Sequence, residues 1–526
     1  MVGEIKWIGV LCLAAAAAAL SAQEPPVVRV NTRLVEVDVV VHSKGQAVAD
    51  LKLDDFTVLD NGKPQKVAAF NVVSSRNSSG KSTPLPPGVV SNRLIDSDQE
   101  PGKTIVLYDM LNTVPEDQSY ARQALVKYLD TLQKGDHFAL YTLGKALSVI
   151  QDFTDDPDRI RRAARRASPE ASADQTADDL ADDLLANAPH TGDPIADAMY
   201  VSSVKEMQDA AQVNRAVITT KALELIARHL KGLPGRKKLI WISSSFAAQT
   251  TDIRSHNGRD TIEHKEFGRE IDKAVRALND ANVAVYPIDP KPIDPVALLR
   301  PGIDAMNLLA GGTGGRAFYV VNDIAAAIKT AVEDSEVTYA LAFYPGDIKL
   351  DGSYHSLSVK VARKGVDLRA RKGYYATELT QPSEKQREES LSEVFATPLE
   401  ATGIGVTALL EPNARQAGVY QLTMTFNLQE LHLEREKDNW VALIKVASYF
   451  PAGPKPNGTE ESIKITLTEA RLRETLANGY TISHMMVLGN RKGEMRVAIQ
   501  DRVTGAAGSV KLLVADSGQP SPKNGQ

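Results

Sequence analysis

The stretch Thr104-Ile105-Val106-Leu107-Tyr108-Asp109 is an apolar run that ends in a carboxylate. Met110-Leu111-Asn112-Thr113 follows it, and an amphipathic pattern over residues 117–133 comes next. This order predicts a buried strand whose C-terminal tip carries Asp109. Open α/β sheets bind their ligands at such tips. The function therefore depends on the residues that surround Asp109.

Short apolar runs and amphipathic segments alternate throughout residues 103–345. The expected strands are 105–109, 138–143, 239–243, 283–289 and 339–344. The expected helices are 117–133, 214–231, 263–279, 304–309 and 324–332. Buried strands that alternate with helices predict a mostly parallel sheet with helices on both faces. We therefore expect one doubly wound, Rossmann-like α/β domain over residues 103–345.

Composition places the chain among globular proteins of several domains. Its 526 residues exceed the size of one core, and 43% hydrophobic and 24% charged residues are ordinary values. The net charge of -5 gives no general attraction to nucleic acid or to an anionic membrane surface. We therefore expect no nucleic-acid partner, whereas the oligomeric state does not follow from composition.

The N-terminus has the features of a secretory signal. Lys6 precedes an apolar stretch from Trp7 to Leu20, and Ser21-Ala22 offers a small-residue cleavage site. This stretch is shorter than the about 20 apolar residues of a bilayer span. We expect residues 1–22 to be removed and the protein to be exported to the periplasm or the extracellular space, with no membrane span. Because Cys12 is the one cysteine, the mature chain would have no disulfide.

Strand-like segments lie on both sides of the expected α/β domain. Leu34 to Val39 alternates apolar and acidic side chains, and Asp60 to Lys63 is a hairpin turn signal. We expect residues 27–73 and 352–375 to form one β-sandwich into which the α/β domain is inserted. Residues 74–102, rich in Ser, Pro and Gly, are expected to be a mobile linker.

The C-terminal part is strand-rich. A polar connector covers residues 376–401, and short strand-like runs separated by Gly and Asn recur from residue 402 onward. This spacing predicts a β-sandwich over residues 402–516, followed by a disordered tail at 517–526. The expected fold is thus multidomain α/β plus β, with a central doubly wound sheet, a flanking β-sandwich and a C-terminal β-sandwich.

A charged insertion, residues 159–190, separates the second and third expected strands of the α/β domain. Arginines cluster over residues 159–166, and aspartates cluster over residues 174–183. One interpretation is an arm that docks on a partner. The other, which the sequence favours, is a pair of helices whose charges offset each other or face water.

Four segments carry a resemblance to a known family. They are Asp54–Gln65, Val106–Thr113, Leu233–Ser243 and Gly311–Phe318. In this order they are similar to the exported von Willebrand factor A-related proteins of acidobacteria. Residues 495–501 also resemble the terminal β domain of that group. The resemblance implies an A-type α/β fold and a binding role, and it supports the fold better than any activity.

The resemblance also implies a cation site at the strand tips. The family binds a divalent ion through Asp-x-Ser-x-Ser after the first strand, a threonine of a neighbouring loop and an aspartate after the fourth strand. A carboxylate of the partner completes the shell. Since Mg²⁺ takes about six oxygen ligands, every one of these positions matters. Asp109 matches the acid and Thr113 the second serine, so these two are the candidate metal ligands.

Two positions depart from the family pattern. Leu111 replaces the first serine and has no oxygen to donate, and Ser244 stands where the second carboxylate is expected. Thr191 or Asp193 is the candidate for the loop ligand. We therefore expect a degenerate metal-ion-dependent adhesion site without a functional Mg²⁺ ion or other cofactor.

The resulting hypothesis is an exported, non-enzymatic protein that binds a protein or cell-envelope partner through its strand tips. The expected contact residues are Asp109, Asn112, Thr113 and Ser244. A scaffold whose β domains, rather than its α/β domain, bind the partner is a further possibility. Two alternatives concern the α/β domain itself. One is an A-type binder with an intact Mg²⁺ site. The other is a secreted hydrolase that uses Ser244 or Asp289, although the serines at 243–245 lack the Gly-x-Ser-x-Gly elbow.

Overall fold

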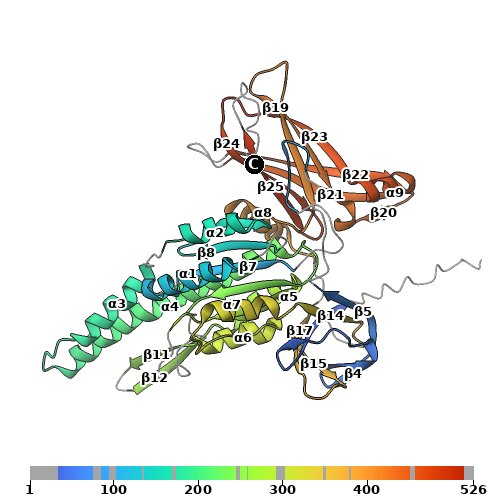
Figure 1. Cartoon of the computed structure of the whole chain (residues 1–526). Helices are drawn as coiled ribbons and strands as arrows, with labels where there is room; N and C mark the ends of the chain where they lie inside the picture. The colour runs from blue at the N-terminus through green and yellow to red at the C-terminus, as the bar shows by residue number, and fades with distance from the viewer. Residues whose placement is uncertain are drawn as a thin grey trace, which may run out of the picture.

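The computed structural model describes residues 34–74, 85–93, 102–132, 136–168, 173–244, 249–256, 259–291, 302–346, 351–377, 381–450 and 457–514. The expected signal at 1–22 and tail at 517–526 lie outside these ranges. Within them, no helix combines the length and the apolar character that a membrane crossing requires. The chain is a mixed α/β structure with several sheets, and its α/β part lies between two β-rich parts (Figure 1).

The central sheet of the α/β part has five strands in the order β13-β10-β7-β8-β9. They are β7 (Thr104–Asp109), β8 (Phe138–Leu143), β9 (Leu147–Thr154), β10 (Lys237–Ile242) and β13 (Val283–Ile288). β13, β10, β7 and β8 pair in parallel, and β9 pairs antiparallel with β8. All residues of the four parallel strands are buried, as expected of a sheet covered on both faces.

Helices cover both faces of this sheet. They are α1 (Pro115–Leu129), α2 (Pro157–Arg166), α4 (Pro194–Leu230), α5 (Gly268–Asp280), α6 (Ile303–Thr313) and α7 (Ile324–Glu333), whereas α3 (Ala173–Ala186) packs on α4. Leu107 shares one core with α4, α5 and α6, and its neighbour Val106 shares the other with α1, α2 and α7. Alternate side chains of β7 therefore reach opposite faces.

The strand expected at 339–344 does not join the parallel sheet. β14 (Val337–Phe343) pairs antiparallel with β1 (Val35–Ser43) and β5 (Val67–Ser74) instead. The prediction was wrong because a short apolar run has the same pattern in either kind of sheet. Only β13, β10, β7 and β8 pair in parallel among the named strands, and the other pairs are antiparallel. Strand pairing in the described chain as a whole is therefore mostly antiparallel.

Strands that come before the α/β part in the sequence and strands that end or follow it together form two sheets. Their orders are β16-β1-β14-β5, with β2 beside β1, and β17-β15-β3-β4. The remaining strands are β2 (Gln46–Ala47), β3 (Phe56–Asp60), β4 (Lys63–Gln65), β15 (Asp351–Val361), β16 (Asp367–Arg369) and β17 (Gly373–Thr377). One apolar cluster, which includes Phe56 and Tyr339, joins the two sheets.

The C-terminal part contains two further antiparallel sheets, β23-β19-β18-β6, in which β6 is Val89–Ser91, and β20-β21-β24-β25, with β22 beside β21. Their strands are β18 (Val406–Pro412), β19 (Val419–Phe426), β20 (Glu434–Glu436), β21 (Asn439–Phe450), β22 (Asn457–Thr468), β23 (Tyr480–Val487), β24 (Gly493–Asp501) and β25 (Ala507–Val514), and α9 (Glu469–Asn478) follows β22. One core, with Met424 and Val497 among its residues, joins both sheets.

Part of the expected linker at 74–102 belongs to the C-terminal part. β6 (Val89–Ser91) pairs antiparallel with β18. The buried Asn92 donates to the carbonyls of Ala401 and Ile404, each at 2.7 Å. The prediction of a linker over the whole segment was wrong because this short strand is stabilised by a partner more than 300 residues later in the chain.

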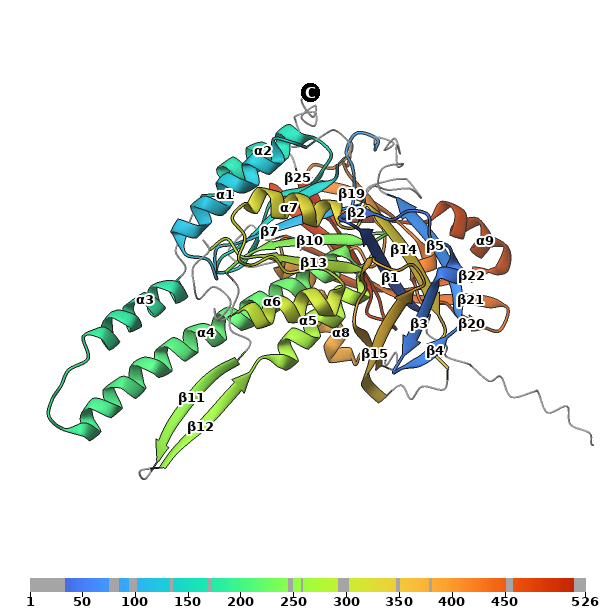
Figure 2. The ribbon, with the colours of Figure 1, turned by 60° about the horizontal axis from the view of Figure 1, so that its bottom comes forward.

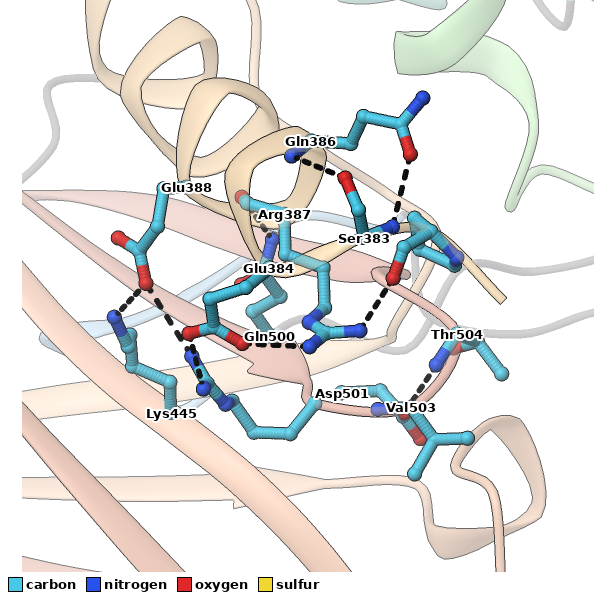
Figure 3. Close-up of polar contacts among 12 residues, drawn as sticks. Ser383, Glu384, Gln386, Arg387, Glu388, Lys445, Gln500, Asp501, Val503 and Thr504 are labelled. Atoms are coloured by element: carbon cyan, nitrogen blue, oxygen red, sulfur yellow. Dashed lines mark hydrogen bonds and ion pairs between the residues drawn. The ribbon is translucent and has the colours of Figure 1, made fainter. Parts of the chain in front are cut away.

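The expected polar connector forms α8 (Glu384–Ala396), a helix between the α/β part and the C-terminal sheets. It begins with a capping box in which Ser383 and Gln386 exchange hydrogen bonds (Figure 3). Its ion pairs with the C-terminal part are Glu384–Arg502, Glu388–Arg502 and Glu388–Lys445, of which Figure 3 labels the last. Those with α4 are Glu393–Lys221 and Glu393–Arg228. α8 thus ties the two parts together.

Glu400, just after α8, should make stability depend on pH. Burial raises its pKa from 4.5 to about 7, and the charge of Asp152 adds to this shift. A carboxyl group with a raised pKa in the folded state binds its proton more tightly there, and this stabilises the fold. The contribution is fully present below the pKa of the unfolded chain and is lost as the pH rises through about 7. The unfolding free energy of the unmodified chain should therefore fall between about pH 5 and about pH 8. Glu400→Gln, which cannot ionise, should make this fall smaller by about 2 kcal/mol. Urea unfolding at several pH values measures this.

The exposed Glu389→Gln is the control for that experiment, and it should leave the pH profile unchanged. A profile for Glu400→Gln that superimposes on that of the unmodified chain would contradict the prediction.

Candidate functional site

Asp109 lies where the strand order of the central sheet reverses. β7 is flanked by β8, the next strand of the sheet along the chain, and by β10, from which the order continues to β13. In doubly wound sheets this switch point, at the carboxyl ends of the strands, is where ligands bind. Ser244 follows β10 at the same edge, and Asn112 and Thr113 lie in the loop between β7 and α1. We call this edge the strand-tip edge.

The carboxylate of Asp109 is fully buried and accepts five hydrogen bonds. Oδ1 accepts from the backbone N–H groups of Leu111 and Asn112, each at 3.0 Å. Oδ2 accepts from Asn112 Nδ2 at 2.8 Å, Trp241 Nε1 at 3.0 Å and Ser243 Oγ at 2.7 Å. A carboxylate has about four lone-pair positions. The five protein donors therefore use all the hydrogen bonds that the Asp109 carboxylate can accept.

Burial and hydrogen bonding act on Asp109 in opposite directions. Burial raises the pKa of Asp109 above its ordinary value, and hydrogen bonds from Asn112, Ser243 and Trp241 oppose this rise. Those donors come from the β7–α1 loop and from β10. The acid therefore fixes the loop after β7 to the neighbouring strand.

Two further contacts hold the same loop against its surroundings. Asn112 Nδ2 also donates to Thr219 Oγ1 of α4 at 2.9 Å. The carbonyl of Thr113 accepts from Gln118 Nε2 at 2.5 Å and from Gln175 Nε2 at 2.7 Å. Gln175 belongs to α3, so the charged insertion covers the loop. The sequence analysis missed these glutamines, although a glutamine on the buried side of α1 was a usable signal for Gln118.

The four expected contact residues are not equally accessible. The exposed fractions of Asp109, Asn112 and Thr113 are 0%, 9% and 1%, whereas Ser244 is half-buried. The expected contact surface of four side chains is therefore not what the structure presents. The strand-tip position followed from the sequence, but the cover supplied by α3 and α4 did not.

The residues at the strand-tip edge do not fit a Mg²⁺ site. The side chain of Leu111, at the family's first serine position, lies in the apolar core. Thr113 Oγ1 accepts from the backbone N–H of Ser244 at 3.1 Å, which uses part of its acceptor capacity. With the Asp109 oxygens also occupied, the described residues around this edge do not supply an octahedral oxygen shell.

Thr191 and Asp193 lie far from Asp109. Asp193 caps the N-terminus of α4, and Thr191 Oγ1 donates to Asp197 at 2.7 Å. Thr219, which contacts Asn112, lies 24 residues after Ile195 on the same helix, and this separation corresponds to about 36 Å. Neither residue can therefore supply the loop ligand that the resemblance implied.

The hydrolase alternative gains no support from the geometry. Ser244 Oγ is buried and has no hydrogen-bond partner within the described ranges, so no base activates it there. Asp289 is buried, and its Oδ1 accepts from the backbone N–H of Lys291 at 3.0 Å.

No family model matches the chain, and no curated protein matches it. Solved structures that resemble it include an aerotolerance-related membrane protein from Bacteroides fragilis, with 13% identity, TM-score 0.26 and coverage of 44% of this chain and 98% of that chain. The vWF domain of a type V pili tip protein from Porphyromonas gingivalis shows 9% identity, TM-score 0.28 and coverage of 44% and 94%. A von Willebrand factor type A protein from Catenulispora acidiphila shows 10% identity, TM-score 0.25 and coverage of 89% and 76%. At these TM-scores the structural similarities support no conclusion about this chain.

Mg²⁺ should not bind at the strand-tip edge. A ligand that binds the folded state alone raises its stability, so millimolar Mg²⁺ should leave Tm within about 1 °C of its value in chelator. Isothermal titration calorimetry should show no binding heat. A micromolar Mg²⁺ affinity that Asp109→Ala abolishes would contradict this expectation.

Asp109→Asn should destabilise the fold. The new amide group would face the N–H and O–H donors of Trp241 and Ser243, and a hydrogen bond to a charged group would be lost. We expect the unfolding free energy to fall by about 3 kcal/mol. Urea denaturation measures the change, with the exposed Asp54→Asn as the matched control. A decrease in unfolding free energy no larger than that of the control would show that the five hydrogen bonds make no net contribution to stability.

Proposed function

We propose that this chain is an exported, non-enzymatic binding protein. Its von Willebrand factor A-like α/β domain contacts a protein or cell-envelope partner at the strand-tip edge, through a degenerate metal-ion-dependent adhesion site. The observation that carries the proposal is the set of five hydrogen bonds to Asp109. A carboxylate held in this way maintains the shape of the edge and has no free oxygen for an ion.

The strand order supports the A-like assignment. An acid at the tip of the middle strand, a parallel core and one antiparallel strand at the sheet's end agree with the resemblance carried by Val106–Thr113 and Leu233–Ser243. Pairing of Ile288 with Phe318 in a parallel bridge extends the same edge beyond β13.

Two projections frame the strand-tip edge. One is the hairpin of α3 and α4, which starts where Gln175 contacts the β7–α1 loop. The other is the hairpin of β11 (Gln249–His256) and β12 (Arg259–Glu266), which follows β10 and contacts α4. Both extend away from the sheet (Figures 1 and 2). A partner that reaches Ser244 would therefore lie between them, and backbone and side chains around the edge would replace the ion as the recognition element.

A binding role is favoured over hydrolysis for a chemical reason. Acyl transfer needs a nucleophile, a base within hydrogen-bond reach and donors for the oxyanion. Among the described residues no base lies within hydrogen-bond reach of Ser244, and the acids Asp109 and Asp289 accept hydrogen bonds from protein donors. A serine-reactive probe should therefore leave Ser244 unlabelled.

Affinity capture tests the proposal. The chain from Gln23 onward, which contains every described residue, is immobilised and exposed to an envelope extract with Mg²⁺ or with chelator. We expect the same protein to be retained in both conditions. Ser244→Arg should reduce its retention about tenfold or more, because a long charged side chain would obstruct the edge. Ser483→Arg, on the exposed face of β23, is the matched control.

Retention that requires Mg²⁺ would overturn the metal-free proposal. Equal retention by Ser244→Arg and Ser483→Arg would place the contact away from the strand-tip edge, and capture of nothing would remove the binding role.

A further inference from the structure

The end of the α3–α4 hairpin is an exposed apolar and acidic surface that the strand-tip edge does not use. We call residues 179–199 the arm tip. Ile195 and Met199 are 72% and 69% exposed, and their spacing of four residues places them on one face of α4. Leu180 on α3 is 52% exposed. Large apolar side chains gathered on a projecting element mark a contact site.

The arm tip is also strongly negative. Residues 179–199 contain five aspartates and no lysine or arginine. Asp179, Asp182 and Asp183 are exposed on α3. A surface that combines acids with apolar anchors fits a partner that combines basic and apolar groups.

The same chain carries such a surface on α1 and α2. Arg159, Arg162, Arg165 and Arg166 are exposed on α2. Between the two helices lies a hollow of about 500 Å³, which Arg165 lines together with Arg122, Gln123, Val126, Lys127 and Asp130. We call this surface the α1–α2 face. Its basic rim and its valine match the acids and the apolar side chains of the arm tip.

The two surfaces do not meet within one chain. α2 packs against α1, β8 and β9, whereas α3 packs mainly against α4 and reaches the β7–α1 loop through Gln175. The described ion pairs of α2 are with Asp130 and Asp158, and the arginines of α2 and the aspartates of α3 named above are exposed, which agrees with the expectation that the charges of this insertion face water. Figures 1 and 2 show the arm tip directed away from α2.

We propose that the arm tip docks on the α1–α2 face of a second copy of this chain. Met199 and Ile195 enter the hollow, and the aspartates of α3 face the arginines of α2. Opposite charges orient the encounter, and the buried apolar anchors stabilise the complex. If each arm reaches the other copy, a closed dimer forms; if the rotation does not close, copies add in a row. This inference does not depend on the partner at the strand-tip edge.

Sedimentation velocity with a charge exchange tests this contact. The chain from Gln23 onward should self-associate at about 50 mM salt, and its association should weaken at least about tenfold at about 500 mM salt. Asp179→Lys/Asp183→Lys and Arg162→Glu/Arg166→Glu should each be monomeric, because like charges would then face each other. An equimolar mixture of the two variants should associate again, since each arm then meets an oppositely charged face.

Two further variants separate the apolar contact from general charge effects. Met199→Gln leaves the charge unchanged and should weaken association about tenfold. Glu411→Lys/Glu434→Lys changes exposed acids of the C-terminal sheets by the same charge and should leave association unchanged. Far-UV circular dichroism verifies that the variants are folded, and Asp179→Asn/Asp183→Asn replaces the lysine variant if that one unfolds.

A monomer at low salt, a mixture that does not associate, or an equal loss in the Glu411→Lys/Glu434→Lys control would each overturn the proposal. Failure of the envelope capture with intact self-association would remove the proposed function and leave this inference standing.

Discussion

A buried charge in a protein interior must be compensated, and at Asp109 the compensation is a complete set of hydrogen-bond donors. The donors come from the loop after β7 and from β10, and Asn112 extends the network to Thr219 on α4. One carboxylate thereby joins two strands and a helix at the point where the sheet is open to ligands. The rest of the strand-tip edge depends on this arrangement.

This compensation has a consequence for recognition. An ion at such an edge offers a partner an exposed positive charge, whereas a saturated carboxylate offers none. What the edge does present is the half-buried Ser244 and the two hairpins beside it, one of which is anchored by Gln175. Recognition at this edge therefore relies on shape and on projecting elements. The insertion that covers the loop also carries the acidic arm tip.

The two β-rich parts make the α/β part a fixed platform for these projections. β14 leaves the α/β part to pair with β1 and β5, and β6 takes the chain through the C-terminal sheets before it enters β7. α8 adds ion pairs to both the α/β part and the C-terminal part, and Figure 3 shows those on the C-terminal side. Since the chain crosses between parts several times, the hairpins project from a body that is held together by paired backbone.

The sequence alone determined what depends on neighbours along the chain. Apolar runs predicted the four parallel strands of the central sheet, though not β9, and the position of Asp109 at a strand tip. The family resemblance implied the loss of ligands at Leu111 and Ser244. The tertiary structure decided which sheet β14 joins, that residues 89–91 form a strand, and that Gln175 and Thr219 cover the expected contact residues. These depend on hydrogen bonds and burial between segments far apart in the chain. A local pattern specifies that a segment is extended and apolar, but it does not specify its partner.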